Sequence, residues 1–399
     1  MAIPYHSPAA APFSPTRRFD KLGIVLVLLV VAGAALLPFV TSKPNRIVPG
    51  EPLPIIGALP LGQAILLYAV VAVGACVAVL RVPNIWRLLV GMGVIGALGL
   101  MLGASATFLA DGNGVARISP AAGFWLLVFA FALLIADALA RLQLGPLARL
   151  GISALIVGVV AAFLWGGVWQ DVSILREYAN RGAAFWAEAR THLLLSFGSL
   201  AAATLVGVPL GIVCNRHGKL RVGVLNVLNV VQTVPSIALF GLLIAPLAWV
   251  AANIPGAAAL GISGIGFAPA MVALFGYSLL PIVANTVAGL DAAPPAVKEA
   301  ARGMGMTERQ VLLEAELPLA LPILLTGIRI VLVQNIGMAT IAALIGGGGF
   351  GVFVFQGIGQ TAMDLVLLGA VPTVALALGA AVVLDAMVEL AEPRKARAA

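Results

Sequence analysis

The sequence contains few charged residues. Only 10% of its 399 residues are Asp, Glu, Lys or Arg, whereas a soluble domain carries about 25%. Hydrophobic residues make up 61% of the chain. A chain of this composition cannot cover itself with a polar surface, so the lipid bilayer must be its solvent. We therefore expect an all-α integral membrane protein.

Cysteine and histidine are also scarce. Cys76 and Cys214 have no metal-site spacing, so we expect them to be unpaired thiols. The three histidines are isolated, and we expect each to be exposed or interfacial: His6, His192 and His217. No Ser-His-Asp, metal or flavin motif occurs, so we expect no catalytic site and no cofactor or metal site on this chain.

The centres of the apolar segments lack Asp, Glu, Lys and His. The charges nearest to them fall near segment ends: Asp137, Arg329, Asp364 and Asp385. A charge at the bilayer centre costs about 2.5–3.5 kcal/mol on insertion scales and usually marks ion or proton coupling, so its absence argues against an ion-coupled carrier. A membrane-embedded lipid enzyme would need polar residues clustered at one interface, and none is found. The phosphate-loop motif G-x-x-x-x-G-K-[ST] is also missing, so any ATPase must be another chain.

Ten apolar segments are long enough to cross a membrane, because roughly 20 helical residues span about 30 Å of hydrocarbon. They lie near residues 22–40, 61–80, 88–109, 121–140, 150–169, 192–213, 222–250, 267–290, 323–345 and 363–387. The first lacks a clear small-residue cleavage site before Ser42, so we interpret it as a retained span rather than a signal peptide.

The positive charges predict the orientation of these spans. With a cytoplasmic amino terminus, sixteen Lys and Arg residues fall inside and six outside, which is the bias expected of inner loops. The inner residues are Arg17, Arg18, Lys21, Arg81, Arg87, Arg141, Arg149, Arg216, Lys219, Arg221, Lys298, Arg302, Arg309, Arg394, Lys395 and Arg397. The outer residues are Lys43, Arg46, Arg117, Arg176, Arg181 and Arg190. Both termini are thus expected in the cytoplasm, and the net charge of +7 needs no nucleic-acid partner.

The spans divide into two groups of five. We expect a cytoplasmic tail (1–21), a five-helix membrane region (22–169), a periplasmic or interfacial segment (170–191), a second membrane region (192–392) and a cytoplasmic tail (393–399). No chemical motif stands out in residues 22–169. In the segment 170–191, one helical face would carry Val172, Ile174, Leu175 and Tyr178. This segment is either an interfacial helix or an ordinary polar loop.

A polar, helix-compatible run interrupts the second group at residues 299–318, EAARGMGMTERQVLLEAELP. Pro295 to Met304 is expected to form a short helix, because prolines are tolerated in a first turn. Gly305 permits a sharp turn.

A second short helix is expected from Glu308 to Ala315. Thr307 can cap it, with Gln310 completing a capping box. Pro318 and Pro322 are then expected to break the helix before the chain re-enters the membrane.

This run resembles the coupling loop of ATP-binding cassette (ABC) importer permeases. Six residues fall at the spacing of that loop: Glu299, Ala300, Ala301, Gly305, Leu317 and Pro318. The resemblance implies that the loop, over residues 291–322, fits a groove on a separate ATPase that binds ATP and Mg. Small alanines would allow close approach, and Glu299 would offer a charge. Ala315 departs from the pattern, where a larger aliphatic is usual, so packing behind the loop would depend on Leu312 and Leu313.

The rest of the second group resembles the five-helix core of type I permeases for osmoprotectants such as glycine betaine and choline. The likeness rests on residues 192–212, 226–240 and 342–355. The whole chain resembles the long form of the osmoprotectant-uptake permease, which lies in the inner membrane of Gram-negative bacteria. This resemblance includes Pro44-Asn45-Arg46 and residues 177–181. The implied partners are ATPase subunits, a second permease chain (as a homodimer or heterodimer), a periplasmic substrate-binding protein and the bilayer. An amino-acid importer of the methionine type is the alternative.

Polar residues near the middle of the core spans are candidates for the translocation path: Gln232, Pro235, Ser236, Gln334 and Asn335. Pro235 is expected to kink its helix and free a carbonyl. Amides suit a pore for a zwitterion or a cation, whereas helix–helix hydrogen bonding is the alternative role. The run Gly346–Gly349 is expected to be a tight turn.

Overall fold

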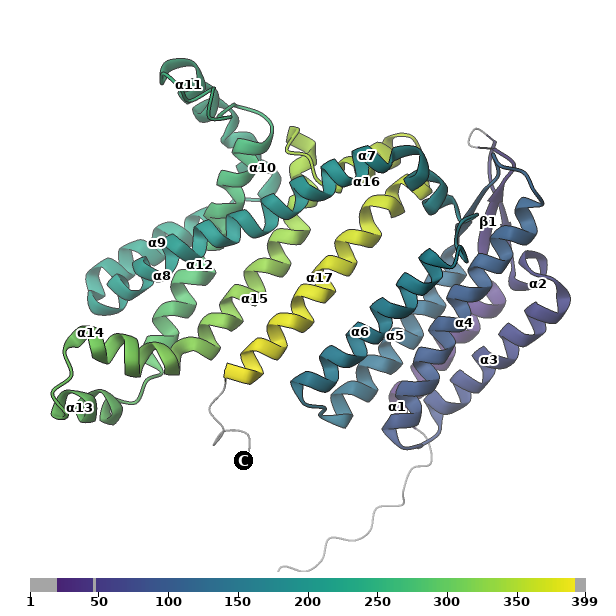
Figure 1. Cartoon of the computed structure of the whole chain (residues 1–399), viewed down its shortest axis with the longest axis horizontal. Coiled ribbons are helices and arrows are strands. Elements are labelled where there is room, and N and C mark those ends of the chain that lie inside the picture. Colours follow the sequence, from purple (N-terminus) through teal and green to yellow (C-terminus); the bar gives the residue numbers. More distant parts are fainter. Residues whose placement is uncertain (1–19, 46–47, 392–399) are drawn as a thin grey trace, which may run out of the picture. The chain divides into compact units, whose positions relative to one another are not determined.

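A computed structural model describes residues 20–45 and 48–391, which form two compact units that are described separately (Figure 1). Unit 1 is Met1–Leu144 with Phe163–Val172, and unit 2 is Gly145–Ala162 with Ser173–Ala399. His6, Arg17, Arg18, Arg46, Arg394, Lys395 and Arg397 lie outside the described residues, whereas Lys21 begins the first helix. Helices dominate the described chain, and nine of them are long and apolar enough to cross a membrane. The expected helical membrane protein is thereby confirmed.

Unit 1 consists of long helices and a small sheet. Its helices are α1 (Lys21–Val31), α2 (Ile55–Ala58), α3 (Leu61–Val79), α4 (Asn84–Ala110) and α5 (Ala122–Leu142). Its strands are β1 (Val40–Lys43), β2 (Glu51–Leu53) and β3 (Arg117–Pro120), and β1 pairs antiparallel with both others. The strands are too short and too polar to give a sequence signal, and none was expected.

The first expected span is shorter than expected. Helix α1 continues through a π-helical turn, Ala32–Leu36, and then the chain becomes extended at Leu37 (φ −109°, ψ 150°). Leu37 precedes Pro38, and the ring of a proline disfavours helical geometry in the residue before it. The apolar helix therefore ends at Leu36 instead of Val40, and it falls outside the nine long spans.

A buried arginine ties three helix ends of unit 1 together. Arg87, in the first turn of α4, is only 2% exposed. Its Nη1 lies 3.0 Å from an Asp20 carboxylate oxygen and 2.9 Å from one of Asp137, and its Nη2 donates to the Ala78 carbonyl at 2.7 Å. Arg141 pairs with the same two aspartates at 2.9 Å each. A buried charge needs such partners, so this cluster joins α1, α4 and α5.

Unit 2 contains most of the remaining helices, both long and short. They are α7 (Ser173–Leu193), α8 (Ser199–Arg216), α9 (Gly218–Thr233), α10 (Ser236–Leu242), α11 (Ile244–Asn253), α12 (Phe267–Asp291), α13 (Pro295–Gly303), α14 (Glu308–Gln310), α15 (Leu317–Ile341), α16 (Gly351–Gly359) and α17 (Met363–Ala391). Helix α6 (Pro146–Trp165) passes from unit 2 to unit 1 after Ala162.

Close backbone approach sets the packing of α8 on α12. A side chain at Gly211 would lie 2.5 Å from the Thr286 Cβ, and one at Gly207 would lie 2.8 Å from Ile282. Small residues of this kind let membrane helices pack closely where no hydrophobic effect drives them together. Arg329, expected near a span end, lies in the middle of α15 and pairs with Asp385 of α17. The two charges thus neutralise each other.

The segment 170–191 is mainly a helix, not a polar loop. Helix α7 bends at Arg181 and continues through a π-helical turn into α8, so one helical run covers Ser173–Arg216. Three of its apolar side chains, Ile174, Tyr178 and Phe185, pack on the core around Phe350 and Phe353. The expected apolar face therefore contacts the protein itself.

Two further expectations need correction. The span expected over 222–250 is interrupted, since α9 ends at Thr233 and α10 begins at Ser236, on either side of an extended Val234–Pro235 step. Pro235 cannot continue the helical hydrogen bonds. His192 is fully buried rather than exposed, and its Nδ1 lies 3.4 Å from the Phe350 backbone nitrogen. Its burial follows from the inward face of α7.

Candidate coupling loop and translocation path

The polar loop has the expected helix–turn–helix form. Helix α13 begins at Pro295 as predicted, and Gly305 adopts a left-handed conformation (φ +84°) that side chains disfavour. The Thr307 hydroxyl accepts the Gln310 backbone N–H at 3.4 Å, while the Gln310 side chain accepts the Thr307 N–H at 2.9 Å. The predicted capping box is therefore confirmed.

The expected helix break at Pro318 and Pro322 is wrong. The chain runs from α14 through a π-helical segment, Val311–Glu316, directly into α15. Pro318 is the second residue of α15, and the helix already runs through it from the π-helical segment. Pro322 lies inside the helix, and membrane helices tolerate such prolines because neighbouring groups satisfy the freed carbonyls. The loop is consequently continuous with a membrane span.

One face of the loop is free and the other is packed. Glu299, Ala300 and Gly305 are exposed, and Met304 beside them is 72% exposed. Ala301 is only 3% exposed and faces the chain's own interior. The two alanines thus differ in their surroundings: Ala300 is exposed, and Ala301 packs against the rest of the chain.

The packing behind the loop is supplied by one of the two expected leucines. Leu312 packs on the buried residues Leu290, Ala320 and Leu324, whereas Leu313 is 49% exposed. Ala315 is half-buried. With a small residue at this position, the apolar packing of the π-helical segment comes from Leu312, which contacts α12 and α15, and from the fully buried Val311.

A buried glutamate anchors the loop, and sequence reasoning missed it. Glu316 is 0% exposed, its Oε2 lies 2.6 Å from Arg216 Nη2, and its Oε1 lies 3.2 Å from Lys298 Nζ. Arg216 ends α8 and Lys298 belongs to α13, so this cluster joins three segments. Lys298 also donates to the Leu290 carbonyl at the end of α12, at 3.2 Å. We call Glu316, Arg216 and Lys298 the loop anchor.

A signal for Glu316 was present in the sequence. It lies four residues after Leu312, and this spacing places both residues on the same helix face. An acid on a core-facing side must have a buried partner, because an unpaired buried charge is strongly unfavourable. The partner Arg216 could not be identified, since it lies 100 residues away in the sequence.

Two exposed ion pairs support the loop. Arg302 of α13 contacts Glu308 of α14 through two hydrogen bonds, of 2.8 and 3.1 Å, which bridge the Gly305 turn. The hydrogen bond and charge of Glu308 raise the pKa of Arg302. Asp291, the last residue of α12, accepts from Asn215 at 2.6 Å and from Arg221 at 2.8 Å. The contacts of Asp291 fix the start of the loop on α8 and α9.

Among the candidate path residues, Gln232 and Pro235 lie around one helix interruption. Gln232 donates to the Tyr277 carbonyl at 2.8 Å, and the Tyr277 hydroxyl donates to the Val234 carbonyl. Val234 precedes Pro235, so the carbonyl at the break has a partner on α12. Ser236 begins α10 immediately afterwards. This arrangement places an amide, a phenol and irregular backbone together.

Asn335 and Gln334 lie apart from that break. Asn335 is completely buried, and its Nδ2 lies 2.8 Å from both Ser199 Oγ and Ser278 Oγ. It therefore joins α8, α12 and α15. This is helix–helix hydrogen bonding, the role given above as the alternative to lining the path. Gln334 is half-buried, and its amide nitrogen lies 3.5 Å from the Met338 sulfur.

The glycine run forms the expected tight turn. Gly346, Gly348 and Gly349 all have positive φ. The Gly349 N–H donates to a Glu188 carboxylate oxygen at 2.6 Å, so α7 holds this turn. Among residues 20–45 and 48–391, no group of three or more His, Cys, Asp or Glu side chains could hold a metal ion.

Comparisons with known proteins match both parts of the chain. Residues 207–397 match the family "Binding-protein-dependent transport system inner membrane component", and residues 20–175 match "ABC transporter permease YehY, N-terminal domain". The osmoprotectant import permease protein OsmW of Salmonella typhimurium is 43% identical, over 47% of this chain and 82% of OsmW. The choline transport system permease protein OpuBB of Bacillus subtilis is 36% identical, over 55% of this chain and 92% of OpuBB.

A solved structure of the MetNI methionine ABC transporter in inward-facing conformations also matches. It is 23% identical with a TM-score of 0.47, and the match covers 53% of this chain and 97% of that chain. Likeness at this level does not bear on the cargo.

Proposed function

Because the chain belongs to the inner-membrane permease components of binding-protein-dependent ABC transport systems, we propose that it forms part of the translocation path for a small osmoprotectant. The cargo class is that of the related permeases, whose names specify osmoprotectants and choline. Glycine betaine and choline both carry a quaternary ammonium group. We further propose that a separate ATPase drives the transport through residues 299–318.

One observation supports the coupling role most directly: an exposed surface lies on a segment that is continuous with a membrane span. Glu299, Ala300 and Gly305 are free for a partner, while the π-helical segment leads without a break into α15. A force applied to α13 would therefore reach α15 along the helix, and α8 through the loop anchor. Coupling requires that the ATPase contact the loop differently in the two states of the transporter.

The loop anchor makes this transmission specific. A loop held only by exposed ion pairs would detach easily, since each such pair contributes about 0–1 kcal/mol to stability. Glu316 is instead fully buried between two cations, and breaking a buried pair of this type costs about 3–5 kcal/mol. We therefore expect Glu316 and Arg216 to move together with α13, which carries Lys298.

The chemistry at the Pro235 break suits the proposed cargo. A quaternary ammonium cannot donate hydrogen bonds, and it is attracted by aromatic faces and by carbonyl dipoles. Gln232 and the irregular backbone at Val234–Pro235 offer amide and carbonyl dipoles without a fixed charge, while the buried Tyr277 holds the Val234 carbonyl. A path without a fixed charge would pass a zwitterion or a cation without trapping it.

The proposed assembly contains a second permease chain, two ATPase subunits and a periplasmic binding protein. Both termini and the coupling loop would lie in the cytoplasm, as the count of Lys and Arg residues indicates. In unit 2, Arg216, Lys298 and Glu316 meet at one end of the bundle, which supports this orientation for the loop.

The test is uptake of labelled choline and glycine betaine into vesicles that contain the chain with its ATPase and binding protein. We expect Glu299→Lys and Gly305→Pro to lower uptake by at least about tenfold, the scale of a typical coupling free energy. Proline cannot adopt the positive φ of Gly305. Glu51→Lys, a charge reversal at an exposed acid of β2, is the matched control. Normal uptake by both loop variants at normal abundance would exclude the coupling role, and uptake of methionine alone would exclude the cargo class.

A further inference from the structure

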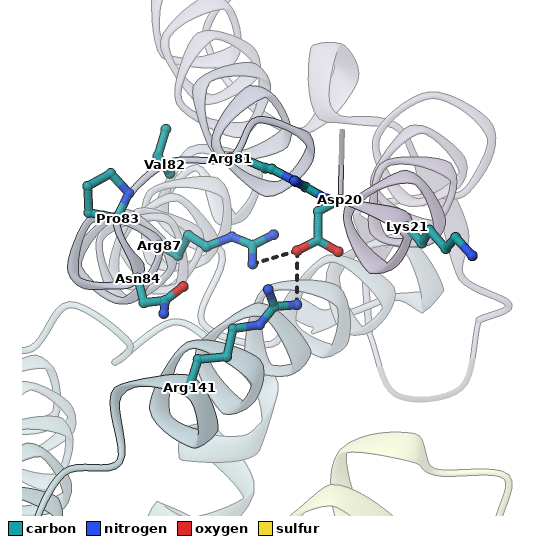
Figure 2. A pocket seen from close by; sticks show the side chains of 8 residues that line it. All are labelled: Asp20, Lys21, Arg81, Val82, Pro83, Asn84, Arg87 and Arg141. Atoms are coloured by element: carbon teal, nitrogen blue, oxygen red, sulfur yellow. Dashed lines mark ion pairs between the residues drawn. The ribbon is translucent and has the colours of Figure 1, made fainter. Parts of the chain in front are cut away.

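A pocket of about 660 Å³ opens at one end of unit 1 (Figure 2). Its wall is made by the start of α1, the turn between α3 and α4, the first turn of α4 and the last turn of α5. The polar residues that line it are Asp20, Lys21, Arg81, Asn84, Arg87 and Arg141. Four of these six are cations, so the pocket favours a negatively charged ligand.

The carboxylates near the pocket do not neutralise all of this charge. Asp20 and Asp137 are both shared by Arg87 and Arg141. Lys21 and Arg81 form no ion pair with any described residue. Four cations against two carboxylates leave a net charge of +2 at the pocket. Two of the cations are thus available to a ligand.

Hydrogen-bond donors lie in the same wall. Arg87 lines the pocket and is 98% buried, and its Nε, which is itself buried, has no acceptor among the described residues. Asn84 opens α4, whose 27 residues direct the positive end of the helix dipole at this wall. The first N–H groups of a helix lack intrahelical partners and readily bind phosphate groups. The buried unpaired donor and the helix start therefore point to the same type of ligand.

We propose that this pocket binds a phosphate group, in the form of a phospholipid headgroup or a soluble phosphate. The flanking surface is apolar, since Ile85 and Trp86 beside Asn84 are 45% and 56% exposed. Tryptophan is enriched at the depth of lipid headgroups. A headgroup phosphodiester at this depth would contact Arg81 and Lys21 while its acyl chains lie along α4.

The experiment measures ligand retention on the purified full-length chain in a neutral detergent by native mass spectrometry. The probes are phosphatidylglycerol, diacylglycerol, which lacks the phosphate, and inorganic phosphate as a competitor. Because Lys21 and Arg81 are exposed and pair with no described residue, Lys21→Gln and Arg81→Gln should not disturb the fold. Lys219→Gln, an exposed cation of α9, is the matched control.

We expect phosphatidylglycerol to bind more tightly than diacylglycerol, and each pocket substitution to weaken it about fivefold, as for loss of about 1 kcal/mol per surface cation. The Lys219→Gln variant should bind as the unmodified chain does. Displacement of the lipid by millimolar phosphate would identify a soluble phosphate as a second source of the same group. Equal binding of both lipids, or unchanged affinity in the double variant Lys21→Gln/Arg81→Gln, would overturn the proposal.

Discussion

Units 1 and 2 each bury a charged side chain that joins several segments: Arg87 in unit 1, and Glu316 in unit 2, which also buries Glu177 and Asp364. Arg87 binds Asp20, which caps α1, Asp137 of α5 and the Ala78 carbonyl of α3, all within its own bundle. Glu316 binds two cations, one of which belongs to the short exposed helix α13. The pairing rule is the same in both units, but only the second cluster holds an element with a free outer face.

This difference separates two uses of a buried charge. In unit 1, the cluster joins the starts of α1 and α4, the end of α5 and a carbonyl of α3, so the ion pairs fix how these helices pack. In unit 2, one segment of the cluster is the nine-residue helix α13, on which Glu299 and Ala300 are exposed. A buried pair adds little net stability compared with apolar packing, but breaking it is costly. We therefore expect loss of Arg87 to affect folding and loss of Glu316 to affect transport.

The largest effect is expected from Glu316→Gln, which removes the charge between Arg216 and Lys298. Two cations would then remain at a site that lacks a counter-charge, and about 3 kcal/mol of attachment between the loop and α8 would be lost. Uptake should fall by at least about tenfold, while the chain still inserts in the membrane. The measurement is vesicle uptake together with the ATPase rate of the assembled transporter.

Two variants sharpen this test. Arg216→Gln removes the other side of the 2.6 Å pair and should give a similar loss. Glu51→Gln, an exposed acid outside the loop, should change neither rate. If Glu316→Gln transports normally at normal abundance, the anchor does not transmit force and the contrast between the units disappears.

A smaller effect, of a different kind, is expected from Arg87→Gln in unit 1. The Ala78 carbonyl and both aspartates would lose a buried donor, so the free energy of unfolding should fall by about 2–3 kcal/mol. Thermal unfolding of the purified chain would measure this, and uptake per folded molecule should stay near normal.

Arg141→Gln gives the internal comparison. The Arg141 side chain is 43% exposed, and Arg87 would still pair with both aspartates, so the loss should be well below that of Arg87→Gln. Equal destabilisation by the two substitutions would mean that the burial of an arginine does not determine how much it stabilises the unit 1 cluster.

The features that the sequence predicted well are those that local chemistry determines. Two prolines begin α13, Gly305 takes the positive φ, and Thr307 with Gln310 caps the next turn, all within one short stretch. The long spans follow from apolar runs alone. In each case, the physical cause lies within a few residues of its effect.

The features that were missed depend on partners far along the chain. Glu316 pairs across 100 residues and Arg87 across 50, and neither separation leaves a periodic signal. The expected break at Pro318 failed because the π-helical segment carries the helix through the proline. Asn335 is polar like a path residue, but only the packing of three helices shows that its amide is used inside the bundle.

The smallest effect is expected from Arg302→Gln, which removes an exposed ion pair from the same loop that contains the anchor. Glu308 loses a two-point contact across the Gly305 turn, but water and salt already screen it. Uptake should fall by less than about twofold, and the difference from the unmodified chain should vanish at high salt. The measurement is uptake at low and high ionic strength, with Arg309→Gln as the control, because Arg309 is exposed and forms no ion pair with a described residue. A loss as large as that of Glu316→Gln would show that the exposed pair, and not the buried anchor, holds the loop in its working position.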